Sequence, residues 1–381
     1  MKPIKILHCS DLHLGAELIT LGEIAKERRQ ELLSNFFRIV SLCKEEDIEL
    51  LLIAGDLFEG FNTDKNTIKS VKEGLGTIPD TIVAISPGNH DFIAIDSPYS
   101  DSDWPNNVYI FTKNLEPIEF EDKNLCLWGA AFRSTYVKSP MLLPNGVDEG
   151  RVNVCVIHGD VVSDGQESNY HPITPMQIRL SGMDYIALGH VHKRTDILKN
   201  GSTWYAYCGC PEGKGFDETD EKGVYVGYIS KGAADLSFRP ICLRLNIEKP
   251  IDITNAKSDN EVAQLIGYKL RSDYGASFSE NLYKLILEGS TDENYNPDPF
   301  AVAARLQDEL YYIKISDHSH TAFNLNELSK ETSLKGIFVR KMMAKLNGCI
   351  MENNEREADK IRNAMNIGIK AFDREVNLND Y

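Results

Sequence analysis

The sequence predicts a layered α/β fold, and three patterns lead to this prediction. Five short apolar, β-prone runs are spread over the first half of the chain. In the first third, these runs alternate with segments of helical periodicity. From residue 108 onward, strand-like runs follow one another with turn residues between them. Alternating strands and helices are typical of a sheet covered by helices, and the later strands predict a second sheet packed on the first.

Each predicted element rests on a local pattern. The five apolar runs are expected to be strands and lie at 4–7, 50–54, 81–85, 154–157 and 185–188. A helix is predicted for 23–46, where apolar residues recur at three- and four-residue spacings and form one stripe. That stripe consists of Leu32, Phe36, Ile39, Val40 and Cys43. A second helix is predicted for 66–75, and the regions 108–129 and 152–229 are expected to be rich in strands.

The chain is expected to have three parts, at 1–245, 246–332 and 333–381. The middle part has the pattern of a small α+β unit. Its predicted elements are a helix at 260–271, a strand at 282–287, a helix at 298–311 and a strand at 312–315, with Asp298 as N-cap and Pro299 in the first turn. The last part is expected to be helical, with two apolar stripes formed by Leu334, Phe338, Met342 and Leu346 and by Ile361, Met365, Ile369 and Phe372. Such stripes either pack within their own domain or bind a partner, and both readings stay open.

Composition limits the function classes. With 381 residues, 42% of them hydrophobic and 26% charged, the chain is ordinary for a soluble globular protein of two or three domains. The net charge is −16, and no run supplies the broad basic face that tight unaided duplex binding needs. Eight cysteines are scattered without zinc-knuckle spacing, which favours buried free thiols in a reducing compartment. The first strand begins at once and no apolar run reaches about 18 residues, so a cytoplasmic protein without a membrane span is expected.

Each of the five predicted strands runs into a polar motif. These motifs are Asp11-Leu12-His13, Gly55-Asp56, Gly88-Asn89-His90-Asp91, His158-Gly159-Asp160 and Gly189-His190-Val191-His192. Strands that end together at one edge of a sheet deliver their terminal side chains to a shared crevice, where open α/β sheets bind ligands. The sequence therefore predicts one site built from five segments that are far apart along the chain.

The side chains of these motifs indicate a metal site. Seven candidate ligands offer carboxylate, amide and imidazole donors, which suit Mn, Fe or Zn: Asp11, His13, Asp56, Asn89, His158, His190 and His192. Seven donors exceed the needs of one tetrahedral zinc, so a pair of ions sharing a carboxylate fits better. Two such ions roughly 3.5–4 Å apart polarise a phosphoryl group and lower the pKa of bound water to about 7. The predicted chemistry is hydrolysis of a phosphoester.

In their order along the chain, these motifs resemble those of the calcineurin-like metallophosphoesterase superfamily. Two segments are similar to the corresponding motifs of SbcD-type DNA-repair exonucleases, namely Ser-Asp-Leu-His-Leu-Gly at 10–15 and Gly-Asp-Leu-Phe at 55–58. The segment 207–213 also resembles a Gly-Ser-Pro-type segment of that group, with Cys210 where a serine is commoner. The resemblance implies a four-layer α/β/β/α sandwich, a capping domain that orients DNA, and C-terminal helices that bind an SMC-like ATPase. It further implies a DNA exonuclease or endonuclease in double-strand-break or DNA-end repair, with a homodimer left open.

The resemblance also implies a role for each site residue. One ion would be held by Asp11, His13, Asp56 and His192, and the other by Asp56, Asn89, His158 and His190, with Asp56 as the bridge. Mn²⁺ is the expected metal, with Fe²⁺ or Zn²⁺ as alternatives. His90 would bind no ion but would protonate the leaving oxygen or stabilise charge in the transition state. Asp91 would orient His90.

Several alternatives remain open at this stage. His8 lies within the first strand and is expected to be a core residue, whereas His171 precedes Pro172 in a polar loop and is expected to be solvated. Lys214 adjoins a motif segment and could either touch a phosphate or be solvated. A phosphoesterase acting on cyclic nucleotides or phosphoproteins is the alternative function, although the arginine that phosphoprotein phosphatases carry after Gly-Asp is missing here. A non-catalytic scaffold is the third class, and the intact set of site residues argues against it.

Overall fold

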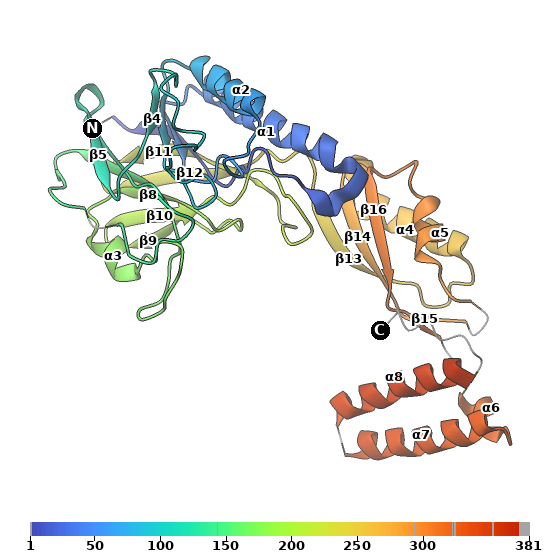
Figure 1. Cartoon of the computed structure of the whole chain (residues 1–381). Coiled ribbons are helices and arrows are strands. Elements are labelled where there is room, and N and C mark those ends of the chain that lie inside the picture. The colour runs from blue at the N-terminus through green and yellow to red at the C-terminus, as the bar shows by residue number, and fades with distance from the viewer. Residues whose placement is uncertain are drawn as a thin grey trace. The chain divides into compact units, whose positions relative to one another are not determined.

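The structure is a computed structural model that describes residues 2–142, 144–292, 295–321, 323, 325–352 and 354–372. The chain divides into two compact units, Met1–Asn246 and Ile247–Tyr381 (Figure 1). Each unit has its own sheet system, and the candidate site lies entirely in the first unit.

The first unit contains two six-stranded sheets. The first sheet has the order β12 (Ala233–Pro240), β11 (Gly223–Ser230), β1 (Ile4–Cys9), β2 (Leu50–Ile53), β3 (Ile82–Ile85) and β4 (Val108–Ile110). The second has the order β5 (Glu116–Phe120), β6 (Leu125–Gly129), β7 (Val152–His158), β8 (Tyr185–Gly189), β10 (Thr203–Tyr207) and β9 (Leu198–Asn200).

Alternation along the central strands explains the layers, because successive side chains of a strand point to opposite faces. Ile6 and Leu52 face the second sheet and share a core with Val154 of β7. Their neighbours Leu7 and Leu51 face the other way and pack in a second core. Burial on both faces explains why these strands read as unbroken apolar runs.

Helices cover the outer faces of the two sheets. In the second core, Phe36 of α1 (Ala25–Glu45) and Val71 of α2 (Lys65–Gly76) pack on the first sheet. On the far side, Ile178 of the short helix α3 (Pro175–Leu180) packs on the second sheet. The predicted four-layer α/β/β/α arrangement is therefore confirmed, and the predicted helices at 23–46 and 66–75 agree closely with α1 and α2.

Parallel pairing brings the predicted motifs to one place. Strands β1, β2 and β3 are parallel neighbours, as are β7 and β8. Their carboxyl ends therefore lie at the same edge of each sheet, and the motif segments start at those ends.

His8 of β1 is buried, as predicted. Its ring nitrogens lie 2.9 Å from Tyr185 Oη and 3.1 Å from the Leu188 carbonyl oxygen.

The second unit begins with an α+β part. A three-stranded sheet has the order β13 (Asn246–Asp252), β14 (Leu282–Glu288) and β16 (Tyr312–Asp317), and a small parallel pair is formed by β15 (Ser290–Thr291) and β17 (His320–Thr321). Helix α4 (Asp259–Tyr274) matches its prediction, but α5 (Pro299–Ala304) is shorter than the predicted 298–311. Asp298 does cap α5, and the chain then tightens into i→i+3 turns that bury Leu306.

The last described residues form helices α6 (Leu325–Lys330), α7 (Leu334–Met351) and α8 (Glu355–Phe372). Helices α7 and α8 pack on each other through Val339, Met365 and Ile369. Residues of the two predicted stripes thus meet, among them Met342 and Met365, whereas Leu334 is 74% and Phe372 45% exposed. Asn353 and residues 373–381 of the predicted tail lie outside the described residues. Of the helices in the described ranges, none combines the length and apolar character needed to cross a membrane.

The prediction of buried free thiols is confirmed for six of the eight cysteines, whereas Cys242 and Cys349 are partly exposed. All eight are free thiols, and six of them are buried in the first unit, among them Cys9 and Cys155 within strands β1 and β7. Burial raises the pKa of the Cys43 thiol to about 12, which keeps this side chain protonated and unreactive. These thiols serve as small apolar core residues.

Candidate metal centre

The loops that carry the motifs are fixed to one another by their backbones. The Asp11 amide donates to the Gly55 carbonyl at 3.0 Å, and the His13 amide donates to the Asp56 carbonyl at 2.9 Å. Asp11, His13, Asp56 and His190 adopt positive φ angles of 55°, 48°, 48° and 101°. Residues with a Cβ rarely adopt such angles, and they persist where the surroundings impose them, typically at functional sites. Of the nine non-glycine residues with positive φ in the described part of the chain, four are therefore candidate ligands at these strand ends.

Two motif glycines make room for the polar side chains. A Cβ on Gly55, whose φ is +90°, would lie 2.2 Å from His158 Nδ1. A Cβ on Gly88 would lie 2.2 Å from the Asp56 carboxylate. Because any larger residue would collide, glycine is required at both positions for the imidazole and the carboxylate to enter the site.

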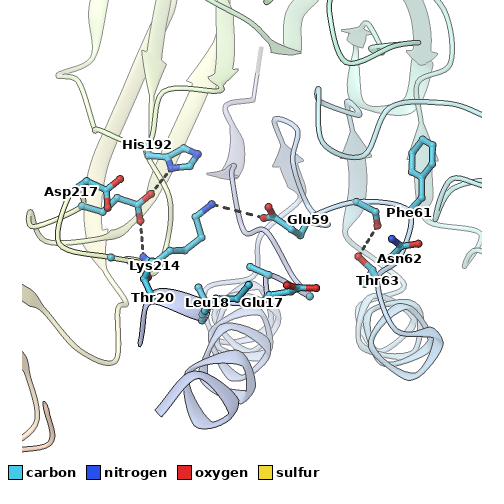
Figure 2. A pocket seen from close by; sticks show the side chains of 16 residues that line it. Glu17, Leu18, Thr20, Glu59, Phe61, Asn62, Thr63, His192, Lys214 and Asp217 are labelled. Atoms are coloured by element: carbon cyan, nitrogen blue, oxygen red, sulfur yellow. Dashed lines mark hydrogen bonds and ion pairs between the residues drawn. The ribbon is translucent and has the colours of Figure 1, made fainter. Parts of the chain in front are cut away.

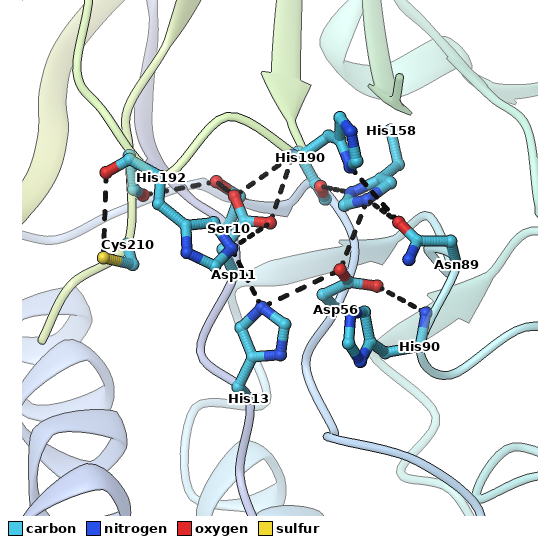
Figure 3. Close-up of polar contacts among 12 residues, drawn as sticks. Ser10, Asp11, His13, Asp56, Asn89, His90, His158, His190, His192 and Cys210 are labelled. Carbon is cyan, nitrogen blue, oxygen red and sulfur yellow. Dashed lines mark hydrogen bonds and ion pairs between the residues drawn. The ribbon is translucent and has the colours of Figure 1, made fainter. Parts of the chain in front are cut away.

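All seven predicted ligand residues converge (Figure 3). Asp56 Oδ2 lies 3.8 Å from His13 Nε2 and 3.4 Å from His158 Nε2. On one side of Asp56, His192 Nε2 lies 3.1 Å from His13 Nε2 and 3.7 Å from Asp11 Oδ1. On the other side, Asn89 Oδ1 lies 3.0 Å from His158 Nε2 and 3.2 Å from His190 Nδ1. Asp56 thus occupies the middle of two groups of donors.

The other ring nitrogen of each of the four histidines faces a hydrogen-bond acceptor outside the cluster. His13 Nδ1 lies 2.8 Å from Glu59 Oε2, and His192 Nδ1 lies 2.5 Å from Glu218 Oε1. The remaining two pairs are His158 Nδ1 with the Ala54 carbonyl at 2.9 Å and His190 Nε2 with Asp160 Oδ1 at 3.3 Å. An acceptor at this position requires the outer nitrogen to carry the proton, which fixes the tautomer.

This tautomer makes the cluster suited to cations. When the rings are neutral, the inner nitrogens present lone pairs, and those of His13 and His192 lie only 3.1 Å apart. Two buried carboxylates, those of Asp11 and Asp56, add negative charge at residues that are each 1% exposed. Converging lone pairs and buried anions repel one another unless positive charge lies among them. Within the cluster, two groups of three candidate ligands each have donor atoms within 4.8 Å of one another and could hold a divalent ion: Asp11, His13 and His192, and Asp11, Asp56 and His158.

The electrostatics of the cluster agree with a demand for positive charge. Burial lowers the pKa of His158, but the Asp56 carboxylate outweighs this effect and raises the pKa to about 9. Burial likewise raises the pKa of Asp56, but His158 and His13 overcome it and hold that pKa well below its usual range. Asp56 therefore remains an anion at the centre of the cluster.

The surroundings of His90 differ from the prediction. Both Asp91 oxygens are engaged in holding loops, because they accept hydrogen bonds from the Gly88 amide at 2.8 Å, the Phe58 amide at 3.1 Å and the Tyr99 hydroxyl at 2.5 Å. The prediction that Asp91 orients the His90 ring is therefore wrong. The carboxylate beside this ring is Glu59, whose Oε1 lies 3.5 Å from His90 Nδ1 and raises the pKa of His90 above its ordinary value.

Further supporting residues were not predicted or were predicted differently. Glu59, Asp160 and Glu218, which hold ligand histidines, had no role assigned from the sequence. His171 is fully buried, and its Nδ1 lies 2.8 Å from the His158 carbonyl, so the prediction of a solvated side chain is wrong. Lys214 lies beside the cluster, with Nζ 3.9 Å from Glu59 Oε2.

A cavity of about 730 Å³ adjoins the cluster (Figure 2). It is lined by residues 15–20, 59–63, 192, 214–215 and 217–218. Four of the lining side chains are acidic, namely Glu17, Glu59, Asp217 and Glu218. Lys214 and His192 are the basic residues of this lining.

The site combines buried carboxylates, an amide and four imidazoles at strand ends with an exposed histidine beside them. This combination is typical of a metal-assisted hydrolase. Comparison of the sequence with protein families agrees, since the family model for calcineurin-like phosphoesterases matches residues 4–194. This match covers half of the chain, and the chain belongs to that family. Family membership makes it a phosphoester hydrolase, and members typically bind two divalent metal ions, for which the clusters described above are candidates.

Three curated proteins illustrate what the chain is similar to. It is 24% identical over 308 residues to the uncharacterized metallophosphoesterase YhaO of Bacillus subtilis, covering 76% of this chain and 73% of that protein. It is 24% identical over 273 residues to the DNA double-strand break repair protein Mre11 of Saccharolobus solfataricus, covering 67% and 68%. The Mre11 protein of Methanopyrus kandleri is 25% identical over 248 residues, covering 58% and 52%.

Proposed function

We propose that this phosphoester hydrolase is a metal-dependent phosphodiesterase that cleaves DNA, as an exonuclease or endonuclease in the repair of DNA ends. The observation that carries the proposal is the convergence of all seven donor residues and His90 at one edge of the two sheets. The similarity to two proteins named for double-strand break repair supports DNA as the substrate. Both alignments are longer than the family match to residues 4–194, so each of them also includes residues outside that range.

The donor residues would hold two ions that share Asp56. Asp11, His13 and His192 would complete one set, and Asn89, His158 and His190 the other, as the two groups around Asp56 suggest. When bound, the ions supply Lewis-acid activation of the phosphoryl group and of the attacking water. Mn²⁺ is the proposed metal, with Fe²⁺ or Zn²⁺ suited to the same donors.

The remaining residues act on the substrate and on the ligands. The His90 ring is 40% exposed, so it can reach a phosphodiester that lies over the cluster. There it would protonate the leaving oxygen or stabilise charge on it. Glu218, Asp160 and the Ala54 carbonyl keep the ligand rings in the tautomer that points lone pairs inward.

The proposal includes an SMC-like ATPase partner. The net charge of −16 leaves little general attraction for DNA, although two divalent ions with two carboxylate ligands would give the site a local charge of about +2. A partner would supply much of the remaining affinity, the α+β part of the second unit would orient DNA, and α7 and α8 would be the docking surface. A homodimer and a cytoplasmic location belong to the same proposal.

Deletion of residues 333–381 tests the docking part. We expect the shortened chain to lose the complex with the ATPase in size-exclusion chromatography while keeping hydrolysis of a small phosphodiester, because the cluster lies in the first unit. Complex formation at unchanged affinity would refute docking through these helices.

A second candidate is a phosphoesterase for small substrates such as cyclic nucleotides or phosphopeptides. The acidic lining of the cavity favours it, since Glu17, Asp217 and Glu218 would repel a second or third phosphate of a DNA strand. One assay separates the candidates. Purified protein is given linear duplex DNA, single strands, a cyclic nucleotide and a phosphopeptide, each with and without Mn²⁺. Turnover of DNA supports the nuclease, whereas turnover of the small substrates alone overturns it.

A further inference from the structure

A loop at residues 211–218 carries Lys214 and is held by the core of the first unit through a buried ion pair. The Arg28 guanidinium of α1 donates to Glu212 Oε1 and to the Gly213 carbonyl, both at 2.8 Å. The side chains of Arg28 and Glu212 are each only 1% exposed, so loss of either partner would leave a buried charge unpaired. The core therefore fixes the backbone from which the Lys214 side chain starts.

The same loop is tied to the metal cluster. The Lys214 amide donates to Glu218 Oε2 at 2.7 Å, and Glu218 Oε1 lies 2.5 Å from His192 Nδ1. One residue further along the chain, the Gly215 carbonyl accepts a hydrogen bond from Asn246 Nδ2 at 2.8 Å. The carboxylate that supports a candidate ligand thus also holds the backbone of Lys214. Lys214 and His192 therefore keep a defined position relative to each other.

The ammonium of Lys214 lies at the cavity beside the cluster (Figure 2). Its Nζ is 3.9 Å from Glu59 Oε2, which is beyond hydrogen-bond distance, and that oxygen lies 2.8 Å from His13 Nδ1. Among the described residues, none accepts a hydrogen bond from this ammonium, and the side chain is 21% exposed. A lysine ammonium has three N–H donors. These donors are therefore available to a molecule in the cavity.

This ammonium is a cation placed beside a candidate site for cations. Burial lowers the pKa of His13, the hydrogen bond with Glu59 opposes this effect, and the nearby charge of Lys214 lowers the pKa further. Two divalent ions with two carboxylate ligands would give the site a local charge of about +2. An ammonium beside this charge is repelled unless an anion lies between them. A phosphodiester group held at the cluster is such an anion.

We infer that Lys214 is a catalytic residue that donates a hydrogen bond to a non-bridging oxygen of the scissile phosphodiester. The inference rests on the proposed function only in that a phosphodiester binds at the cluster, and it does not require DNA. The scissile phosphate fits better than a flanking one, because Glu17, Asp217 and Glu218 line the same cavity and would repel a second phosphate.

The contact stabilises negative charge on the phosphoryl oxygens during the reaction. Lys214 keeps its three protons throughout, so it adds no covalent step. The bonds that form and break are those of the hydrolysis itself, from water to phosphorus and from phosphorus to the leaving oxygen. Loss of the ammonium should therefore affect every phosphodiester substrate, including one that has a single phosphate.

Replacement of Lys214 by methionine tests this expectation, because it removes the charge and keeps the length of the side chain. kcat/KM is measured at saturating Mn²⁺ on bis(p-nitrophenyl) phosphate, which has one phosphate, and on a short DNA single strand. We expect both values to fall about 10–100-fold, the usual cost of losing a hydrogen bond to a charged group. Lys214→Arg keeps a charge and donors, so its loss should be smaller than that of Lys214→Met.

Lys193→Met is the matched control. Lys193 follows His192 directly, but it is exposed and is not among the described residues that line the cavity. This control should stay within about twofold of the unchanged protein on both substrates. An unchanged kcat/KM of Lys214→Met on the small diester would overturn the inference. A loss on DNA alone would place Lys214 at a flanking phosphate and would overturn it as well.

A binding measurement makes the test independent of turnover. Dimethyl phosphate is titrated into Mn²⁺-loaded protein, and Kd is obtained from the broadening of its ³¹P signal by the bound ions. Kd should rise about 10–100-fold in Lys214→Met and stay unchanged in Lys193→Met. Equal Kd values in all three proteins would contradict the inference. Lys214→Gln replaces the methionine variant if the latter does not fold. If the protein hydrolyses the small diester but not DNA, the nuclease proposal alone fails, and both measurements on small phosphodiesters still decide the role of Lys214.

Discussion

Replacement of His90 by alanine should separate catalysis from metal binding. The backbone amide of His90 donates to Asp56 Oδ1 at 3.0 Å, and truncation of the side chain leaves this bond in place. What is lost is the ion pair with Glu59 and the edge contact with the His13 ring, at a side chain that is 40% exposed. We therefore expect normal folding and near-normal metal content. Loss of a general acid should lower kcat by about 10²–10⁴, which is roughly 3–5 kcal/mol in the barrier.

Two measurements on the same sample check this prediction. Metal content is determined by elemental analysis after loading with Mn²⁺, and kcat is measured on a phosphodiester. The matched variant is the neighbouring Asn89→Ala, which should lose metal because Asn89 Oδ1 contacts both His158 and His190. If His90→Ala loses metal as Asn89→Ala does, His90 is a ligand and the reasoning is refuted. The same holds if its kcat is unchanged.

Three further predictions concern the metals and the core. Asp56→Asn should weaken both ions together, by more than the roughly 10–100-fold that loss of a supporting partner costs, as measured by Mn²⁺ titration calorimetry. EDTA should abolish phosphodiesterase activity, and added Mn²⁺ should restore it. Burial lowers the pKa of His8 to about 4, below its ordinary 6.5. Between pH 6.5 and pH 4, His8 is protonated in the unfolded chain but stays neutral in the folded protein. The free energy of unfolding should therefore fall by up to about 3 kcal/mol as the pH decreases over this range. Denaturant unfolding followed by tryptophan fluorescence should show this loss reduced in His8→Gln.

The outcomes that contradict these predictions are distinct. One ion held at full affinity in Asp56→Asn would mean that Asp56 is no bridge. Activity that survives complete removal of metal would exclude the metal-assisted chemistry. An unchanged pH dependence in His8→Gln would mean that His8 is protonated as readily in the folded protein as in the unfolded chain. All three tryptophans, at positions 104, 128 and 204, lie in the first unit, so the fluorescence reports on the unit that contains His8.

The position of the candidate ligand residues could be predicted from the sequence because the signal is local. An apolar run marks a buried strand, and a polar motif directly after it marks the strand end, as with Ile53 of β2 and Asp56. Parallel pairing then brings such ends to one edge without further information. For this reason the seven donors were found to converge although they are spread over positions 11 to 192.

The partners of the ligand rings could not be predicted in the same way. Glu59 contacts His13 across 46 positions and Glu218 contacts His192 across 26, at separations that no helical or strand period relates. Their contacts depend on the course of irregular loops, which a single sequence does not encode in a readable pattern. The prediction of a solvated His171 was wrong for a similar reason, since a polar loop folds back and buries this ring against the His158 carbonyl.

The central claim is that two divalent ions share Asp56. Titration of metal-free protein with Mn²⁺, followed by electron paramagnetic resonance, tests it most directly. The arrangement around Asp56 predicts two Mn²⁺ per chain, with a spectrum that shows the two spins coupled through a shared ligand. A single bound ion, or two ions with uncoupled spectra, would contradict it.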